Sequence, residues 1–380
     1  MRILAFETSC DETAVAVVRD GRWIESNLIA SQVELHRPFG GIVPEAASRA
    51  HLANIVPLLE DTLASLERDG RPVDAVAVTY GPGLAGALLV GVNVAKAVAY
   101  ARGLPLLGLN HLEGHVYANW LVPGSGQRSA ASGQPPAVGS QPPAPAQGAS
   151  AGSSPAPSQA PHSLPGDAAG AAAAMPLEPE FPLVCLIVSG AHSDVVLMRG
   201  HGDYVRLGRT RDDASGEAFD KVARMLGLGF PGGPAIQRAA ESGDPKRFPL
   251  PRAWLGDSYD FSFSGLKTAV LRLLEELGPN PPVADVAASF QAAIVDVLAA
   301  KTARAAAEFG ARQVALAGGV AANVPLRRTV QERVDVEVRL PPIALCTDNA
   351  AMIGAAAYYR WEAGERSDFT LDARPNLPVA

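Results

Sequence analysis

The chain contains little cysteine. Cys10, Cys185 and Cys346 are the three cysteines among 380 residues, and each stands alone in an apolar or strand-like stretch. An odd number of scattered cysteines does not make a disulfide framework and is typical of a reducing compartment. We interpret all three as buried structural thiols.

The chain also lacks an excess of positive charge. It has 32 Lys and Arg against 39 Asp and Glu, which gives a formal net charge of -7. Proteins that coat nucleic acid rely on clustered Lys and Arg to neutralise phosphates. The composition therefore excludes a generally basic binding surface, and any contact with nucleic acid must be local or shared with a partner protein.

The sequence has no uninterrupted apolar run of membrane-spanning length. The longest run, Leu84 to Tyr100, contains Gly91, Asn93 and Lys96, which favours a buried helix. The short apolar stretch at the N-terminus is followed at once by Glu7, and it is too short and too acidic for a secretory signal. We expect a cytoplasmic protein without membrane association.

Residues 123–179 lack both charge and hydrophobic periodicity. They are almost wholly Pro, Ala, Gly, Ser and Gln. Such a composition cannot bury enough apolar area to offset the entropy lost on ordering. We interpret this segment as a disordered insertion that separates two parts of ordinary domain size, and we expect folding not to depend on it.

A weak internal repeat links the two parts. The stretch ILAFETSCDETAVAVV (3–18) aligns without a gap with LVCLIVSGAHSDVVLM (183–198), so that Ser9 matches Ser189 and Thr13 matches Ser193. Each copy reads as a β-hairpin whose tip exposes backbone N–H groups and hydroxyls. Two such hairpins facing each other would make a phosphate clamp, although the match is short enough to arise by chance.

Strand and helix patterns alternate along the rest of the chain. A strand at 73–81 leads to a helix at 84–100, and a strand at 104–110 leads to a helix with Asn110 as N-cap. A strand ending in the glycine pair at 318–319 precedes another helix, and residues 343–346 predict a strand before a helix capped by Thr347. This alternation predicts α/β layers.

Three carboxylates crowd the turn ETSCDET, where Glu7, Asp11 and Glu12 follow an apolar strand. Carboxylates packed together repel one another and are costly to desolvate unless something pairs with them. The edge of an active site is one explanation, and a structural role for Glu7 is the other.

His111 and His115 are four residues apart in NHLEGH, so on a helix both project from one face within reach of one metal ion. Their place just after a strand, where α/β sites concentrate, favours a metal site. Glu113 does not complete the zinc-peptidase pattern, because it lies about 200° around the helix from His111. Asp348 is either a partner of a helix dipole or a third, oxygen ligand, and spacing alone cannot join it to the histidines.

Glycine pairs offer places where a nucleotide could approach the backbone. Asp220, on a predicted amphipathic helix that ends at Gly232–Gly233, could hold ribose hydroxyls. Gly318–Gly319 lead to Asn323, whose amide could bind a base. Glycine pairs at helix entries are also required by turns alone, so their presence does not decide between the two explanations.

Ten motifs occur in an order that resembles the tRNA N6-adenosine threonylcarbamoyltransferase family, formerly described as O-sialoglycoprotein endopeptidases. The resemblance covers nearly all of the chain except 123–179. It implies an α/β fold of the actin/Hsp70/sugar-kinase type, with two related lobes and a nucleotide in the cleft. The motifs are FETSCDET, HRPFGGIVPEAASRAH, YGPGL, NHLEGH, VSGAHS, DDASGEAFDK, FPGGP, FSFSGLKT, AGGVAAN and CTDNAAMIG.

The resemblance also implies an arrangement of parts along the chain. Residues 1–122 would form the N-terminal lobe with the metal-binding histidines, and 180–345 the nucleotide-binding lobe. Residues 346–380 would form a C-terminal helix and tail that return to the metal site.

By motif, the resemblance implies His111, His115 and Asp348 as ligands of one divalent metal ion, either iron (Fe2+) or zinc. Two departures stand out in VSGAHS: Ala191 replaces a usual second glycine and disfavours positive φ, while Ser193 replaces threonine and keeps a hydroxyl. The implied substrate-binding residues are Ile187, Val188, Ser189, Gly190, Ala191, Asp220, Gly233 and Asn323.

The implied reaction moves a threonylcarbamoyl group from threonylcarbamoyl-AMP to N6 of the adenosine 3′-adjacent to the anticodon, in tRNAs that read codons beginning with A. Asp11 and Glu12 would help to remove a proton from the attacking amine or orient the metal-bound group. The implied partners are tRNA, an inactive paralogue subunit and a P-loop ATPase.

Rival functions make different demands on the same residues. An ATPase or sugar-kinase-like enzyme of this fold would hydrolyse ATP alone and be indifferent to loss of the metal ligands. A metalloprotease is disfavoured by the position of Glu113. A non-catalytic scaffold of a modification complex would be expected to lack the histidine pair.

Overall fold

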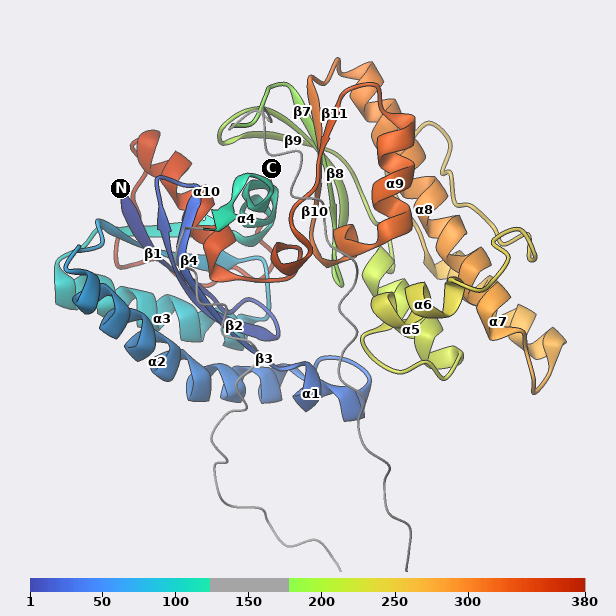
Figure 1. Cartoon of the computed structure of the whole chain (residues 1–380), viewed down its shortest axis with the longest axis horizontal. Helices are drawn as coiled ribbons and strands as arrows, with labels where there is room; N and C mark the ends of the chain where they lie inside the picture. Colours follow the sequence, from blue (N-terminus) through green and yellow to red (C-terminus); the bar gives the residue numbers. More distant parts are fainter. Residues whose placement is uncertain (124–177, 380) are drawn as a thin grey trace, which may run out of the picture. The chain divides into compact units, whose positions relative to one another are not determined.

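A computed structural model of the chain describes residues 1–123 and 178–379 (Figure 1). The expected insertion therefore lies outside the described residues except at its ends. At one end Pro123 pairs with Ile24, and at the other Pro179 is buried. The ordered chain thus extends a residue or two into the range that composition assigned to the insertion.

The first sheet has the strand order β5-β4-β1-β2-β3-β6. β1, β2 and β3 are antiparallel neighbours, whereas β4 and β5 continue the sheet in parallel from β1. The strands are β1 (Arg2–Glu7), β2 (Glu12–Arg19), β3 (Trp23–Ser31), β4 (Ala75–Gly81), β5 (Leu106–Asn110) and β6 (Val122–Pro123).

The second sheet repeats this arrangement in the order β11-β10-β7-β8-β9. Ile3 pairs with Val18 in the first hairpin, and the aligned Leu183 pairs with Met198 in the second. The ungapped alignment is thus reproduced in the pairing register, so the repeat is a duplicated hairpin and not a chance match. The strands are β7 (Leu183–Val188), β8 (Ser193–Gly200), β9 (Asp203–Arg209), β10 (Gln313–Ala317) and β11 (Glu337–Arg339).

Alternate side chains of β1 enter two different cores. Leu4 and Phe6 pack with α2 (Pro44–Asp69) and α3 (Ala85–Arg102), which cover one face of the first sheet (Figure 1). Ile3 and Ala5 belong to the core that contains α4 (His111–Tyr117) and α10 (Ala350–Glu362). The same core includes residues of β7 and β10, so α4 and α10 lie where the two sheets meet.

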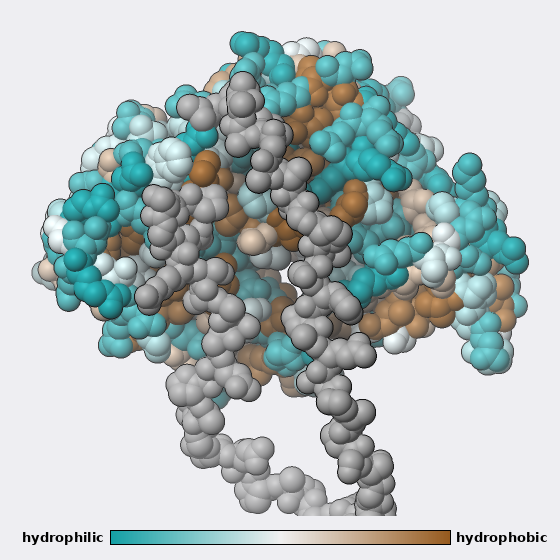
Figure 2. All heavy atoms as spheres, in the orientation of Figure 1, coloured by the Kyte–Doolittle hydropathy of each residue, from teal (hydrophilic) through white to brown (hydrophobic). Residues whose placement is uncertain are grey.

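In the second lobe, helices pack around α8 (Val283–Glu308), whose buried side chains share a core with Val184, Leu186 and Val188 of β7. Among the described residues α8 is long and apolar enough to cross a membrane, but 67% of its most apolar window is buried, as in core helices of soluble proteins. The other elements are α1 (Val33–His36), α5 (Ser215–Met225), α6 (Gly232–Ala240), α7 (Ser264–Leu277), α9 (Val324–Arg333), η1 (Arg37–Phe39), η2 (Ala118–Trp120), η3 (Gly319–Ala322) and η4 (Ile343–Leu345). On the face seen in Figure 2, hydrophobic residues form patches among hydrophilic ones.

Three local predictions are wrong. Residues 343–345 form a 3-10 turn instead of a strand, because the preceding Pro341 and Pro342 lack the N–H groups that a ladder needs. Asn349, and not Thr347, caps α10, since its side chain accepts a hydrogen bond of 3.0 Å from the Met352 N–H. The helix carrying Asp220 also ends early, at Met225, and Gly232–Gly233 begins α6.

Equivalent glycines hold each hairpin against its parallel neighbour. A Cβ on Gly83, just after β4, would lie 2.5 Å from the Ser9 carbonyl oxygen. A Cβ on Gly318, just after β10, would lie 2.4 Å from the Val188 carbonyl oxygen, and its φ of 86° and ψ of 169° belong to a region almost confined to glycine. At the end of each hairpin, the glycine backbone therefore lies so close to a carbonyl oxygen of the hairpin that a side chain would not fit.

We predict that Gly318→Ala lowers the free energy of unfolding by roughly 3 kcal/mol or more, since it adds a clash to the backbone strain. Gly310→Ala is the matched control: φ is 58° but no described atom lies within 4 Å of the added Cβ, so about 1 kcal/mol is expected. Urea denaturation measures both, and equal losses would contradict the close contact at Val188.

Candidate metal centre

The local sequence places both histidines at the start of α4. β5 ends at Asn110, whose side-chain oxygen accepts hydrogen bonds from the N–H groups of Leu112 (2.9 Å) and Glu113 (3.4 Å). This N-cap, predicted from sequence, begins the helix at His111 itself. The two imidazoles therefore lie one turn apart on the same face, with ring centroids 4.6 Å apart.

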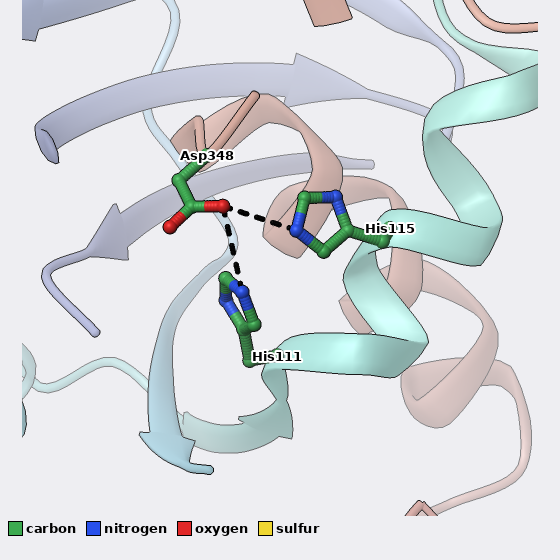
Figure 3. A group of neighbouring side chains, drawn as sticks. All are labelled: His111, His115 and Asp348. Atoms are coloured by element: carbon green, nitrogen blue, oxygen red, sulfur yellow. Dashed lines mark hydrogen bonds and ion pairs between the residues drawn. The ribbon is translucent and has the colours of Figure 1, made fainter. Parts of the chain in front are cut away.

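Asp348 completes the group from the segment just before α10. Its Oδ1 lies 3.0 Å from His115 Nε2 and 3.5 Å from His111 Nε2 (Figure 3). One ligand atom from each of the three residues lies within 4.8 Å of the others, so the group could hold a metal ion. The structure brings together three residues that spacing alone could not join.

The donor set and its electrostatics fit a divalent cation. Two imidazoles and one carboxylate are ligands of catalytic zinc and of non-haem iron(II), with positions left open for substrate. Burial opposes a charge on His111, yet the carboxylates of Asp348 and Glu7 raise its pKa to about 9. Burial likewise acts against the charge of Asp348, but His111 and His115 hold its pKa well below the ordinary value. The local field thus favours positive charge at this point.

Glu7 orients His111 from the end of β1. Its side chain is fully buried, and its Oε2 lies 3.1 Å from His111 Nδ1 and accepts a 2.6 Å hydrogen bond from the Thr79 hydroxyl. Ser9 Oγ lies 3.0 Å from the same Nδ1. These contacts leave Nε2 of His111 directed at Asp348. A hydrogen bond to the second ring nitrogen is the usual means of orienting a metal-binding histidine.

Asp11 and Glu12 are adjacent in sequence but contact different partners. A carboxylate oxygen of Asp11 lies within 4.8 Å of ligand atoms of Asp348 and Cys10. Burial and the charge of Asp348 raise the pKa of Asp11 to about 6. Glu12 instead accepts a 2.9 Å hydrogen bond from the Ser31 hydroxyl on β3, and burial and Asp11 raise its pKa to about 8. Asp11 is thus the member of this pair that lies beside Asp348.

Cys10, Asp11 and Asp348 form a second group that could hold a metal ion. Burial and Asp11 raise the pKa of the Cys10 thiol well above its ordinary value. A protonated thiol is a poor ligand, because metals bind the thiolate. Cys185 and Cys346 are buried free thiols, as the sequence predicts. The histidine group is therefore the better candidate.

The second hairpin presents its backbone where the resemblance implies substrate binding. Ile187 and Val188 have fully buried side chains and pair with Asp194 and Ser193 of β8, while Gly190 and Ala191 at the tip are exposed. Among the described residues, the non-glycine positions with positive φ are Asp20 and Leu255. The turn therefore accepts Ala191 without the positive φ that an alanine would resist.

The residues expected to bind a nucleotide differ in whether their polar groups and the space around them are already occupied by the protein. Asp220 accepts a 2.7 Å hydrogen bond from the Gly232 N–H and lines a pocket of about 660 Å³ between residues 37–40 and 227–230. At Gly233 no described atom lies within 4 Å of an added Cβ, so a ligand could approach closely. The Asn323 amide, in contrast, caps α9 and donates a 2.8 Å hydrogen bond to Gln291.

Comparisons with known proteins agree on one family over nearly the whole chain. The profile of the tRNA N6-adenosine threonylcarbamoyltransferase family matches residues 24–133 and 162–355. Relatives of this name are 54% identical in Thermomicrobium roseum, covering 100% of this chain and 97% of that protein, and 47% identical in Dehalococcoides mccartyi, covering 100% and 99%. The chain belongs to the tRNA N6-adenosine threonylcarbamoyltransferase family. The resemblance read from the ten motifs is confirmed.

Solved structures show the fold of this threonylcarbamoyltransferase family member. HypF from T. kodakarensis has a TM-score of 0.56 at 14% identity, covering 95% of this chain and 48% of that one. Full-length HypF in a phosphate- and nucleotide-bound form has a TM-score of 0.53 at 11% identity, covering 96% and 46%. The neighbours belong to the actin/Hsp70/sugar-kinase type, so the predicted fold class is confirmed.

Two contacts of the candidate metal site were not predicted from sequence. The first joins Glu7 to His111, and a signal for it existed: parallel strands β1, β4 and β5 end at one edge, which brings Glu7, Thr79 and Asn110 together. The second turns Glu113 away from the histidines to Arg360, 2.9 Å away. Its direction was predicted, but its partner lies 247 residues on and carries no sequence signal.

The raised pKa of Glu12 predicts a pH-dependent stability. In the unfolded chain Glu12 ionises near 4.5 and in the fold at about 8, so its stabilising contribution is complete below pH 4.5 and is lost as pH rises through about 8. Glu12→Gln should therefore gain stability relative to the parent as pH rises from about 5 to about 9, by on the order of 1 kcal/mol or more. Thermal melts across this range measure the difference. The exposed Glu34→Gln should show none, and a Glu12→Gln difference independent of pH would contradict the assignment.

Proposed function

We propose that this chain transfers the threonylcarbamoyl group from threonylcarbamoyl-AMP to N6 of the adenosine 3′-adjacent to the anticodon, in tRNAs that read codons beginning with A. The convergence of His111, His115 and Asp348 in a member of this family is the observation that carries the proposal. The N6 amine would form a bond to the carbamoyl carbon, the bond from that carbon to the AMP phosphate oxygen would break, and one proton would leave the amine.

The three residues would hold one divalent ion, iron (Fe2+) or zinc. When bound, the ion supplies Lewis-acid polarisation of the carbamoyl group, which a weakly nucleophilic exocyclic amine requires. Glu7 would keep the Nε2 atom of His111 directed at the ion through its contact with Nδ1.

Asp11 is our candidate for the group that receives the amine proton. Its carboxylate lies beside Asp348, and its pKa of about 6 keeps it mostly ionised yet basic near neutral pH. Glu12, with a pKa of about 8, is mostly protonated at neutral pH and contacts Ser31. We therefore assign Glu12 a supporting electrostatic role in place of a second base.

The donor adenylate would lie on the second lobe. The backbone of residues 187–191 and the open face of Gly233 would receive the phosphate and sugar, and the Asp220 carboxylate would bind ribose hydroxyls. The Asn323 amide, already engaged by Leu326 and Gln291, would contribute by fixing the start of α9 beside the adenylate.

The acidic chain would need help to bind tRNA. A net charge of -7 gives little non-specific attraction to phosphates. We propose that an inactive paralogue subunit and a P-loop ATPase assist it, as the resemblance implies, and that the protein acts in the cytoplasm. The same fold also serves ATPases and sugar kinases, so ATP hydrolysis without transfer is the alternative function.

We predict that His111→Ala abolishes transfer and greatly reduces bound metal while the protein stays folded, because two remaining ligands hold an ion poorly. The measurement is mass spectrometry of tRNA nucleosides after incubation with threonine, bicarbonate, ATP, the carbamoyl-adenylate synthase and the partner subunits, together with elemental analysis of the purified protein. His201→Phe is the control. It keeps an aromatic ring in the Tyr359 stack, loses a 2.7 Å contact with the Tyr117 hydroxyl of α4, and removes no ligand, so it should retain both metal and transfer.

Retention of normal transfer by His111→Ala after thorough chelation would contradict the metal-dependent mechanism. ATP hydrolysis unaffected by loss of His111, with no modified nucleoside formed by the parent protein, would favour the ATPase alternative.

A further inference from the structure

The two elements that supply the ligand group are joined by a buried ion pair on the side opposite the histidines. Glu113, between His111 and His115 in sequence, has a side chain only 1% exposed. Its carboxylate accepts hydrogen bonds from Arg360 Nε at 2.9 Å and from Arg360 Nη2 at 2.9 Å. Arg360 lies near the end of α10, and Asp348 lies just before the start of that helix.

α4 is too short to hold its own position. It has seven residues, about 10 Å of helix, so the direction of His111 and His115 depends on what α4 packs against. The helix that α4 packs against is α10. A Cβ on Gly114 would lie 2.6 Å from Ile353 Cδ1 and 3.1 Å from Met352 Cγ, so the α4 backbone rests directly on side chains of the first turn of α10.

Glu113 and Gly114, the two residues before His115 in HLEGH, thus both contact α10. Gly114 sets how closely α4 approaches the first turn of α10, and the forked contact from Arg360 to Glu113 sets where α4 lies along that helix. Tyr204 of β9 donates a 3.0 Å hydrogen bond to the same carboxylate and ties it to the second sheet. A planar guanidinium binding two carboxylate oxygens restricts direction as well as distance.

We propose that Glu113 and Arg360 are positioning residues for the metal ligands: their ion pair holds α4 in register with α10, so that Asp348 meets both histidines. This inference rests on the metal site of the proposed function. Removing one partner would leave a buried charge unpaired and let α4 shift, which separates His111 and His115 from Asp348 without altering any ligand.

The test is the dissociation constant for Co2+, measured on the full chain by competition with a chelator and by the visible absorption spectrum of the bound ion. Glu113→Gln and Arg360→Lys should each weaken Co2+ binding 10- to 100-fold, the range typical of lost support for metal ligands, and should change the spectrum. Arg360→Lys keeps the charge and loses only the fork, so it serves if Glu113→Gln fails to fold.

Arg2→Gln is the matched control. Arg2 is also a largely buried arginine that bonds two carboxylates, Glu25 and Asp69, but it lies at the opposite end of β1 from Glu7. We expect it to lower the melting temperature while leaving the Co2+ dissociation constant and spectrum unchanged. This separates a positioning effect from general loss of stability.

The outcomes are distinguishable. If the parent binds Co2+ through His111 but Glu113→Gln and Arg360→Lys bind it equally well, the positioning role is wrong and the metal site stands. If His111→Ala binds Co2+ as well as the parent, the metal site itself is wrong and this inference fails with it. If Arg2→Gln loses as much Co2+ affinity as Glu113→Gln and Arg360→Lys, the Glu113–Arg360 ion pair contributes only general stability and the positioning role is wrong.

Discussion

Burial of several carboxylates at one point is the constraint on which the rest of the site depends. Glu7, Asp11 and Asp348 meet where the first hairpin, α4 and the start of α10 converge. Their mutual repulsion must be balanced by positive charge. Without an ion, the balance falls to His111, whose pKa rises to about 9 although it is buried. A bound divalent cation would supply the same balance and leave the imidazole neutral for ligation.

The duplicated fold explains why this point lies where it does. Each lobe has a hairpin in the middle of its sheet with a parallel strand beside it, and a glycine after that strand presses on the hairpin. In the first lobe the hairpin end carries carboxylates, whereas in the second it carries Ser189, Gly190 and Ala191. In the function we propose, the first copy would face a cation and the second would face phosphate groups. α4 and α10 lie in the core that joins the two copies.

Much of the fold and part of the site could be predicted from sequence, because these features depend on local residue patterns. The hairpin repeat, the Asn110 cap and the shared face of His111 and His115 all depend on residues within a few positions of one another. The errors have local causes as well: Pro341 and Pro342 prevent a strand, and Asn349 displaces Thr347 as the cap. Local patterns could not join Asp348 or Arg360 to their partners, which lie more than 230 residues away and meet them only through packing of α10. Asp348 was assigned as a ligand through the family resemblance alone.

The central claim is that His111, His115 and Asp348 hold one metal ion. Anomalous X-ray diffraction from crystals of the metal-loaded protein, collected on both sides of the iron and zinc absorption edges, tests it most directly. We predict one anomalous peak at bonding distance from Nε2 of both histidines and from a carboxylate oxygen of Asp348. A peak on Cys10 and Asp11 that leaves the histidines hydrogen-bonded to Asp348, or loaded crystals without any peak in this core, would contradict it.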